Sequence, residues 1–246
     1  MLITTEYVDI PAGGSPMRCF LARPRAGGRH PGVVFYSDIF QLTGPMLRVS
    51  GRLAGYGFAV LAPEIYHRIE PPGSPIPFDD AGRTRGLDDA ARTPVAHFDA
   101  DARAAIDFLA AHPAVAPGHL AAAGFCLGGH LAFRAALQPD VKATTCFYGT
   151  GIHDGRLGLD PDAGSLARAA EIRGKLLMIF GSSDPHVPEG GRKTIDASLR
   201  AAGVDHSIQL YPAEHAFMRD EGPRYDPEQT DRAFGAMVGL FRGTFS

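Results

Sequence analysis

One cysteine stands in a pattern that can activate it as a nucleophile. Cys126 lies in Gly124-Phe125-Cys126-Leu127-Gly128-Gly129, between the apolar run Leu120 to Ala123 and a helical pattern that begins directly after it. A strand-to-helix turn of this kind strains the backbone of the nucleophile, and the flanking glycines are needed because a Cβ would collide with neighbouring backbone. The helix start also places free N–H groups beside the sulfur, which favours a thiolate and a developing oxyanion. We therefore predict that Cys126 is a nucleophile.

The other two cysteines lack this setting. Cys19 alternates with Met17 and Leu21 in a strand pattern, and Cys146 stands among apolar residues, so both are predicted to lie in the core. Three widely spaced cysteines without a C-x-x-C pair indicate neither a disulfide framework nor a zinc ribbon. A small buried hydrophobe is the ordinary alternative for any free cysteine, but the flanking glycines of Cys126 favour the nucleophile.

A nucleophile on such a turn needs an acid and a histidine that follow later strands, in the chain order nucleophile, acid, histidine. Asp184 follows the apolar run Leu176 to Phe180, and His215 follows a strand pattern that ends at Tyr211. His215 would carry protons to and from the sulfur and the leaving oxygen. Asp184 would fix the tautomer of His215 and stabilise its imidazolium form.

Two further histidines lie near these residues in the sequence. His186 comes two residues after Asp184, so it would compete for the place of the acid rather than that of the base. His130 follows Cys126 by one helical turn and is expected to point along the helix. No histidine or carboxylate shows a zinc-ligand spacing such as H-E-x-x-H, so a metal is not indicated.

Composition and charge exclude several classes of partner. The chain has 45% hydrophobic and 21% charged residues and a formal net charge of -3, with no run of arginines that would neutralise several phosphates. Nucleic acid is therefore not an expected partner. No stretch approaches the ~18 apolar residues of a membrane span, and the start of the chain lacks a basic region followed by an apolar one. We expect a cytoplasmic protein without a membrane partner.

Strand and helix patterns alternate along most of the chain. Strand patterns occur at Thr4 to Ile10, Met17 to Arg23, Val33 to Tyr36, Phe58 to Ala62, Leu120 to Gly124, Ala143 to Tyr148, Leu176 to Phe180 and Ser207 to Tyr211. Helical patterns follow Thr43-Gly44-Pro45 and Thr93-Pro94, and occur at Leu127 to Leu137, near Lys193 to Ala202 and near Pro227 to Phe241. This order predicts an α/β fold with a mostly parallel sheet, helices on both faces and an N-terminal antiparallel hairpin.

One segment departs from the alternation. Residues Glu64 to Arg92 are rich in Pro, Gly, Asp and Arg and show little periodicity. Loops of this length are usually functional or disordered, so we predict a long loop that faces the substrate. Neither an internal repeat nor a linker divides the chain, and we expect a single domain over residues 1–246.

Several motifs together resemble the dienelactone hydrolase family, which has the α/β-hydrolase fold. Ser37-Asp38-Ile39-Phe40 is similar to the family's Q-E-I-F, Leu61 to Tyr66 is similar to A-P-D-L-Y, and Gly124 to Gly129 is similar to G-F-C-x-G-G. The resemblance covers about Val33 to Phe217. It implies a carboxymethylenebutenolidase-like hydrolase of small esters or lactones that forms a thioester on its cysteine and needs no cofactor.

The resemblance also implies roles for further residues. The backbone N–H groups of Ile39 and Leu127 would form the oxyanion hole. Asp38 replaces the family's glutamate, which takes the proton of the resting cysteine; it keeps the charge but has a shorter reach, and His215 could instead activate the thiol directly. Arg219 matches an arginine that binds the substrate carboxylate. The second such arginine falls at Arg83 or Arg85, and we favour Arg83.

Other functions compete with lactone hydrolysis. A broad carboxylesterase would use the same three residues, and the loop residues would decide between the two. A redox-sensing thiol on a hydrolase scaffold belongs to another class, because an activated thiolate is also oxidisable, but no resolving cysteine is evident. The substrate and the oligomeric state are not predicted by the sequence.

Overall fold

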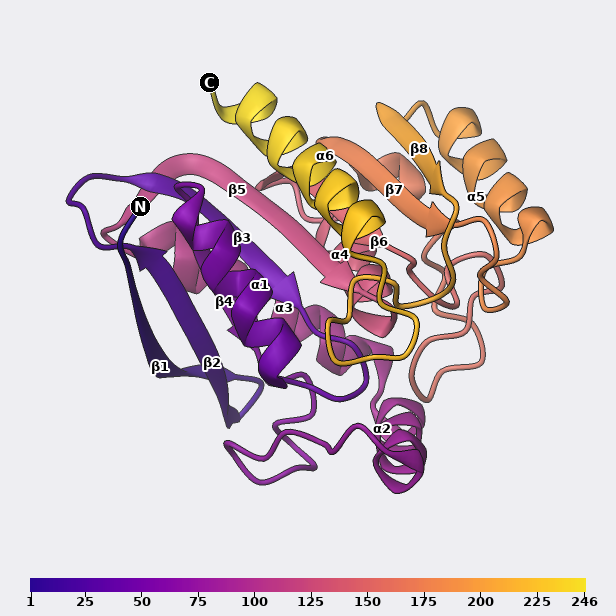
Figure 1. Cartoon of the computed structure of the whole chain (residues 1–246), viewed down its shortest axis with the longest axis horizontal. Coiled ribbons are helices and arrows are strands. Elements are labelled where there is room, and N and C mark those ends of the chain that lie inside the picture. The colour runs from indigo at the N-terminus through magenta and orange to yellow at the C-terminus, as the bar shows by residue number, and fades with distance from the viewer.

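The computed structural model describes all 246 residues and has one eight-stranded sheet at its centre (Figure 1). The strand order across the sheet is β1-β2-β4-β3-β5-β6-β7-β8. The strands are β1 (Ile3–Ala12), β2 (Ser15–Pro24), β3 (His30–Tyr36), β4 (Ala59–Pro63), β5 (Val115–Phe125), β6 (Val141–Phe147), β7 (Lys175–Gly181) and β8 (His206–Tyr211). The pairs β1–β2 and β2–β4 are antiparallel and all other pairs are parallel, which confirms the predicted sheet and its N-terminal hairpin.

Helices cover both faces of the sheet. They are α1 (Gly44–Gly55), α2 (Asp80–Arg92), α3 (Val95–Ala111), α4 (Leu127–Ala135), α5 (Glu189–Ala201) and α6 (Pro227–Phe245), with a short 3-10 helix at Ala169–Glu171. Apolar side chains of α1 and α6 form one core with their face of the sheet, and those of α3, α4 and α5 form a second core with the other face. In Figure 1, α1 and α6 lie in front of the sheet and α3 and α4 lie behind it.

The central strands are buried on both faces, as their continuous apolar runs predict. Every residue of β4 and the last five of β3 are buried. Each of these parallel strands ends at the same edge of the sheet, so the loops that follow β3, β5, β7 and β8 gather there. This edge is where the predicted site residues are found.

The prediction of a loop throughout Glu64 to Arg92 is wrong for its second half, where α2 occupies thirteen residues. The Asp79 side chain begins this helix by accepting a hydrogen bond of 2.7 Å from the Gly82 N–H. Gly86 allows the helix to approach the loop after β3, because a Cβ there would collide with the Ile39 carbonyl oxygen. The glycines that weaken the helical pattern in the sequence are thus required by packing.

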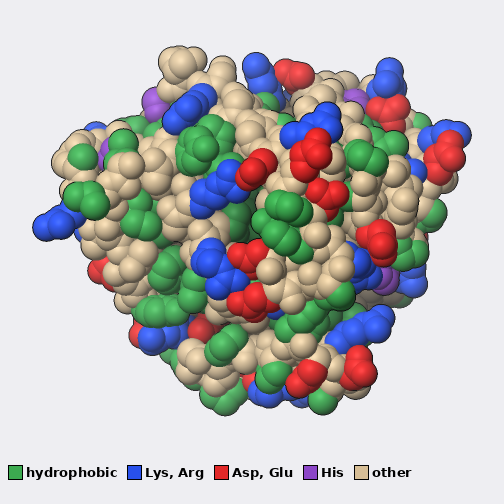
Figure 2. Space-filling model, viewed as in Figure 1, with side chains coloured by type: hydrophobic (Ala, Val, Ile, Leu, Met, Phe, Trp, Pro, Cys, Tyr) green, Lys and Arg blue, Asp and Glu red, His purple; other side chains and the backbone are tan.

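The surface carries mixed charge on the face formed by α1 and α6. Figure 2 shows basic and acidic side chains interspersed among apolar ones on this face rather than gathered by sign. Several of these charges are paired, for example Arg52 with Asp231 and Arg48 with Asp220. None of the helices is both long enough and apolar enough to cross a membrane.

Candidate active site

The backbone of Cys126 is held in a strained conformation between β5 and α4. Its φ of 55° and ψ of -119° lie where side-chain-bearing residues are rarely found. The glycines of the motif permit this turn, because a Cβ at Gly124 would collide with the Gly128 carbonyl oxygen and one at Gly128 with the Ser37 carbonyl oxygen. Cys126 is partly exposed, whereas Cys19 and Cys146 are buried, as predicted.

His215 and Asp184 lie beside Cys126 at the carboxyl edge of the sheet. His215 Nε2 is 3.2 Å from Cys126 Sγ, and His215 Nδ1 is 2.7 Å from Asp184 Oδ2. The second oxygen of Asp184, Oδ1, accepts a hydrogen bond of 2.8 Å from the backbone N–H of His186. His215 is only 5% exposed and Asp184 only 3%, so the structure brings together three residues that are far apart in the sequence and shields two of them from water.

The charges around His215 favour its protonated form. Burial alone would lower the pKa of His215, but the Cys126 sulfur and Asp184 outweigh it and raise the pKa to about 10. Burial alone would raise the pKa of Asp184, but the hydrogen bond from His215 and its charge lower it below its ordinary value. The arrangement therefore suits an imidazolium placed between the Asp184 carboxylate and the Cys126 sulfur.

The two other cysteines are in surroundings that disfavour a thiolate. Burial raises the pKa of Cys19, with nearby carboxylates adding to the effect, and burial alone raises the pKa of Cys146. Both side chains are inaccessible to solvent. Among the three cysteines, only Cys126 combines access, a helix start and a histidine partner.

Almost the whole chain is similar to proteins of one family. The family model described as "Dienelactone hydrolase family" matches residues 17–245. This chain belongs to the dienelactone hydrolase family. It is 36% identical over 252 residues to a Saccharomyces cerevisiae protein named "Putative carboxymethylenebutenolidase", covering 98% of this chain and 92% of that protein. It is also 30% identical to "Carboxymethylenebutenolidase" from Pseudomonas sp. (strain P51), covering 93% of this chain and 91% of the relative.

Solved structures agree with the family assignment. A crystal structure of a "Putative Dienelactone Hydrolase" from Klebsiella pneumoniae has a TM-score of 0.87 and 27% identity, covering 98% of this chain and 99% of that one. An esterase from Pyrobaculum calidifontis, at 20% identity and a TM-score of 0.71, shares the fold. The predicted family and α/β-hydrolase fold are thus confirmed, and the chain is a dienelactone hydrolase-like enzyme that acts on ester or lactone bonds.

Asp38 and Arg219 of this chain bind one another. Arg219 Nη1 donates a hydrogen bond of 2.6 Å to Asp38 Oδ2, and the Phe40 N–H donates one of 2.9 Å to Asp38 Oδ1. The Arg219 guanidinium also lies 4.1 Å from the ring centroid of Phe78, which belongs to the segment before α2. No hydrogen bond joins Asp38 to Cys126 in this structure. The predicted thiol acid and the predicted carboxylate-binding arginine are therefore partners of each other.

Breaking this pair should destabilise the fold. Arg219→Met leaves the mostly buried Asp38 carboxylate without its cation, which typically costs about 3 to 5 kcal/mol, so we expect the free energy of unfolding in urea to fall by about 3 kcal/mol. The double variant Arg219→Met/Asp38→Asn should recover part of this loss because no unpaired charge is left. Arg92→Met, which breaks an exposed pair with Asp88, is the matched control and should change stability by less than about 1 kcal/mol. A loss no larger than that of the control would contradict a structural role for the pair.

The remaining predicted residues lie around the same edge. Leu127 is the first residue of α4, so its N–H has no partner within the helix, and Ile39 lies in the loop after β3. Arg83 is exposed on α2 without an ion-pair partner, whereas Arg85 binds Glu70. Burial and the charge of His215 lower the pKa of His186. Asp184 acts in the opposite direction, and the charges of Arg224 and Arg83 lower the pKa further.

Two aromatic residues near the site, Tyr148 and Phe78, were not predicted from the sequence to be site residues. The Tyr148 ring lies edge-on to His215 with 5.1 Å between ring centroids, and Phe78 covers Arg219. Tyr148 directly follows β6 at the carboxyl edge of the sheet, and that position was the available signal. Phe78 offered none, because its contact with Arg219 joins segments far apart in the chain.

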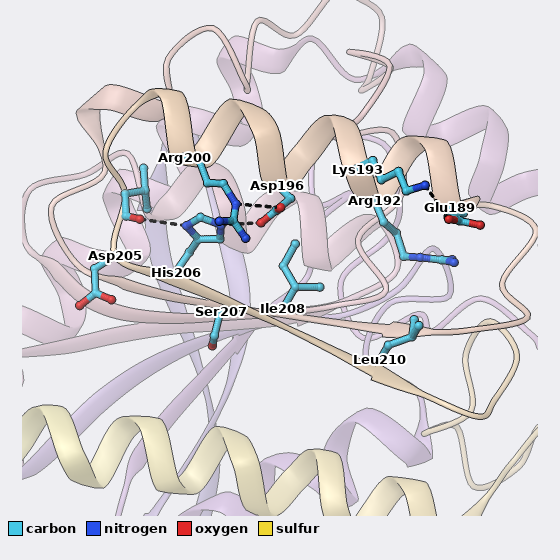
Figure 3. A pocket seen from close by; sticks show the side chains of 11 residues that line it. Glu189, Arg192, Lys193, Asp196, Arg200, Asp205, His206, Ser207, Ile208 and Leu210 are labelled. Carbon is cyan, nitrogen blue, oxygen red and sulfur yellow. Dashed lines mark hydrogen bonds and ion pairs between the residues drawn. The ribbon is translucent and has the colours of Figure 1, made fainter.

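A surface groove lies away from these residues. It has a volume of about 760 Å³ and runs between α5 and the edge strand β8 (Figure 3). Its charged side chains are largely paired with each other: Lys193 with Glu189, and both Arg200 and His206 with Asp196. The groove contains neither Cys126 nor His215, so it is separate from the candidate site.

Proposed function

We propose that Cys126 is the nucleophile of this hydrolase, with His215 as its acid-base partner and Asp184 as the group that orients His215. The contact of His215 with both the sulfur and the carboxylate carries the proposal, because it gives the imidazole a proton acceptor on one side and a fixed tautomer on the other. A thiolate and an imidazolium in contact would form the reactive ion pair.

In the proposed reaction, Cys126 Sγ attacks the carbonyl carbon of the ester or lactone. The N–H groups of Ile39 and Leu127 stabilise the negative oxygen of the tetrahedral intermediate. His215 then protonates the leaving oxygen as the C–O bond breaks, which leaves a thioester on Cys126. A water molecule that loses a proton to His215 attacks the thioester and releases the carboxylic acid, and the thiolate returns.

The proposed substrate is a small lactone that carries a carboxylate. The Pseudomonas relative is named as a carboxymethylenebutenolidase, and two arginines, Arg219 and Arg83, are proposed to bind the acid group. Burial raises the pKa of Asp38 although Arg219 and the Phe40 N–H act against it, so this carboxylate accepts a proton more readily than an exposed one. A substrate carboxylate that takes over Arg219 would release Asp38, which could then accept the proton of the thiol in place of His215.

We also propose that the protein is a single domain located in the cytoplasm. One sheet takes its eight strands from β1 near the N-terminus to β8 near residue 211, which favours a single domain over residues 1–246. All three cysteines are free, and a thiol nucleophile must stay reduced, which favours the cytoplasm. The proposed partner is the small-molecule substrate alone.

A panel of substrates tests the proposed specificity. We expect carboxylated lactones to have a higher kcat/KM than neutral lactones and p-nitrophenyl esters of equal size, by about tenfold to a hundredfold, because a hydrogen bond between charged groups is worth roughly 1.5 to 3 kcal/mol. Equal kcat/KM values across the panel would favour a broad carboxylesterase. No turnover of any member, together with reversible oxidation of Cys126, would favour a redox-sensing thiol and overturn the proposal.

A further inference from the structure

Residues 147–150, which run from the last residue of β6 into the loop after it, form a backbone clamp on the turn at Cys126. The Cys126 N–H donates to the Phe147 carbonyl oxygen at 3.0 Å, and the Thr150 N–H donates to the Cys126 carbonyl oxygen at 3.2 Å. Within the same segment, the Tyr148 ring packs edge-on against His215. One short segment therefore contacts Cys126 through its backbone and His215 through the Tyr148 ring.

His130, on α4, holds this segment in place through a hydrogen bond. Its Nδ1 is 3.0 Å from the Thr150 carbonyl oxygen and its Nε2 is 2.7 Å from Ser165 Oγ. Because a carbonyl oxygen only accepts hydrogen bonds, Nδ1 must carry the proton and Nε2 must accept from the Ser165 hydroxyl. The ring is fully buried, and its hydrogen bond to Thr150 links α4 directly to the clamp.

A second layer of residues fixes this tautomer. Ser165 Oγ accepts a hydrogen bond of 2.9 Å from Arg134 Nη1, which leaves the serine proton for His130. Arg134 itself binds Asp99 through two hydrogen bonds of 2.7 and 2.6 Å. Burial, and then the charge of Arg134, lower the pKa of His130 to about 3, so the ring stays neutral over the working range of an enzyme. Every polar atom of the His130 ring thus has one defined partner.

We infer that His130 is a positioning residue for hydrolysis: through the Thr150 carbonyl it holds residues 147–150 so that Cys126 keeps the strained backbone that directs its sulfur toward His215. The inference rests on the proposed role of Cys126 as nucleophile. A backbone held at a positive φ persists only where its surroundings over-determine it, and the hydrogen bonds of this clamp supply that restraint. Small displacements of reacting groups can cost about a hundredfold in rate.

Two amide substitutions of His130 separate positioning from simple stability. In His130→Asn the side-chain N–H can take the place of Nδ1 and keep the bond to Thr150, whereas in His130→Gln the amide reaches the place of Nε2 and that bond is lost. Both variants replace a buried ring by a smaller amide, so both should lower the unfolding temperature. We expect acylation of Cys126 by saturating p-nitrophenyl acetate to slow about 10- to 100-fold in His130→Gln and by less than about threefold in His130→Asn.

Single-turnover acylation rates, measured well below the unfolding temperature of both variants, test whether His130 positions Cys126. Equal losses in the two variants, or none in His130→Gln, would overturn the positioning role. A wild-type protein that hydrolyses the ester without any adduct on Cys126 would overturn the proposed nucleophile and this inference with it. If His130→Gln does not fold, Ser165→Ala serves instead, because it removes the donor that fixes the tautomer; acylation should slow about fivefold, and an unchanged rate would overturn the inference.

Discussion

Replacing Cys126 by alanine is expected to lower the turnover of an activated ester by at least about 10³-fold, because loss of a nucleophile removes the covalent pathway and leaves only binding and the oxyanion hole. The backbone should keep its conformation, since alanine occupies the same strained position with a smaller side chain. Initial rates with p-nitrophenyl acetate measure the loss. Cys146→Ala is the matched control: its thiol is buried in the core, so turnover should persist in the folded protein.

Rapid quenching followed by intact-mass measurement and peptide mapping identifies the acylated residue. We expect one acyl group for each chain, on the peptide that contains Cys126, because burial raises the pKa of both other thiols and removes them from solvent. Acylation shared equally with Cys19 or Cys146, or full turnover by folded Cys126→Ala, would be incompatible with the proposed nucleophile.

The proximity of Cys126, Asp184 and His215 could be predicted because these residues follow strands of one sheet. Parallel strands end at a common edge, so a cysteine after β5, an aspartate after β7 and a histidine after β8 must come near each other even though 89 residues separate Cys126 from His215. The buried strands were recognisable as continuous apolar runs. The prediction needed only the order of the three residues along the chain and the positions where the strands end, and both can be read from the sequence.

The partners of Asp38 and Arg219 could not be predicted in the same way. These residues are 181 positions apart, and their contact depends on how the loop after His215 folds over the loop after β3. From the sequence, Asp38 was predicted to accept the proton of the thiol and Arg219 to bind the carboxylate of the substrate. Nothing in the local pattern of either residue indicates that their charges would meet.

Helix α2 and His130 illustrate a second limit. The glycines of α2 lower its helical propensity and are explained only by the backbone that it approaches, including the Ile39 carbonyl. His130 was expected to point along its helix, but its ring is fixed by Thr150 and by Ser165, which lies 35 residues away. Both features result from tertiary contacts, which propensity and periodicity do not encode.

Substitution of Asp184 by asparagine should lower kcat/KM by about 10²- to 10⁴-fold while the protein stays folded. Asparagine keeps the size of the side chain but removes the charge that supports the imidazolium, and it can hold His215 in the wrong tautomer. His215→Gln should cause a loss of at least that size because it removes the proton carrier. Asp205→Asn, in the exposed turn before β8, is the matched control and should leave the rate unchanged.

The pH dependence of stability gives this prediction a second measurement. Against the effect of burial, the Cys126 sulfur and Asp184 raise the pKa of His215 from an ordinary 6.5 to about 10 on folding. The contacts of protonated His215 with these two groups therefore stabilise the native state fully below pH 6.5 and progressively less as pH rises toward 10. Asp184 has a lowered pKa, so its own contribution is present above its ordinary value of 3.8 and is lost in acid. The difference in unfolding free energy between wild type and Asp184→Asn should therefore be largest between about pH 4 and 6.5 and shrink toward pH 10. A difference that stays constant over this range would mean that Asp184 does not stabilise an imidazolium at His215, and the rate loss would then have to arise from the tautomer alone.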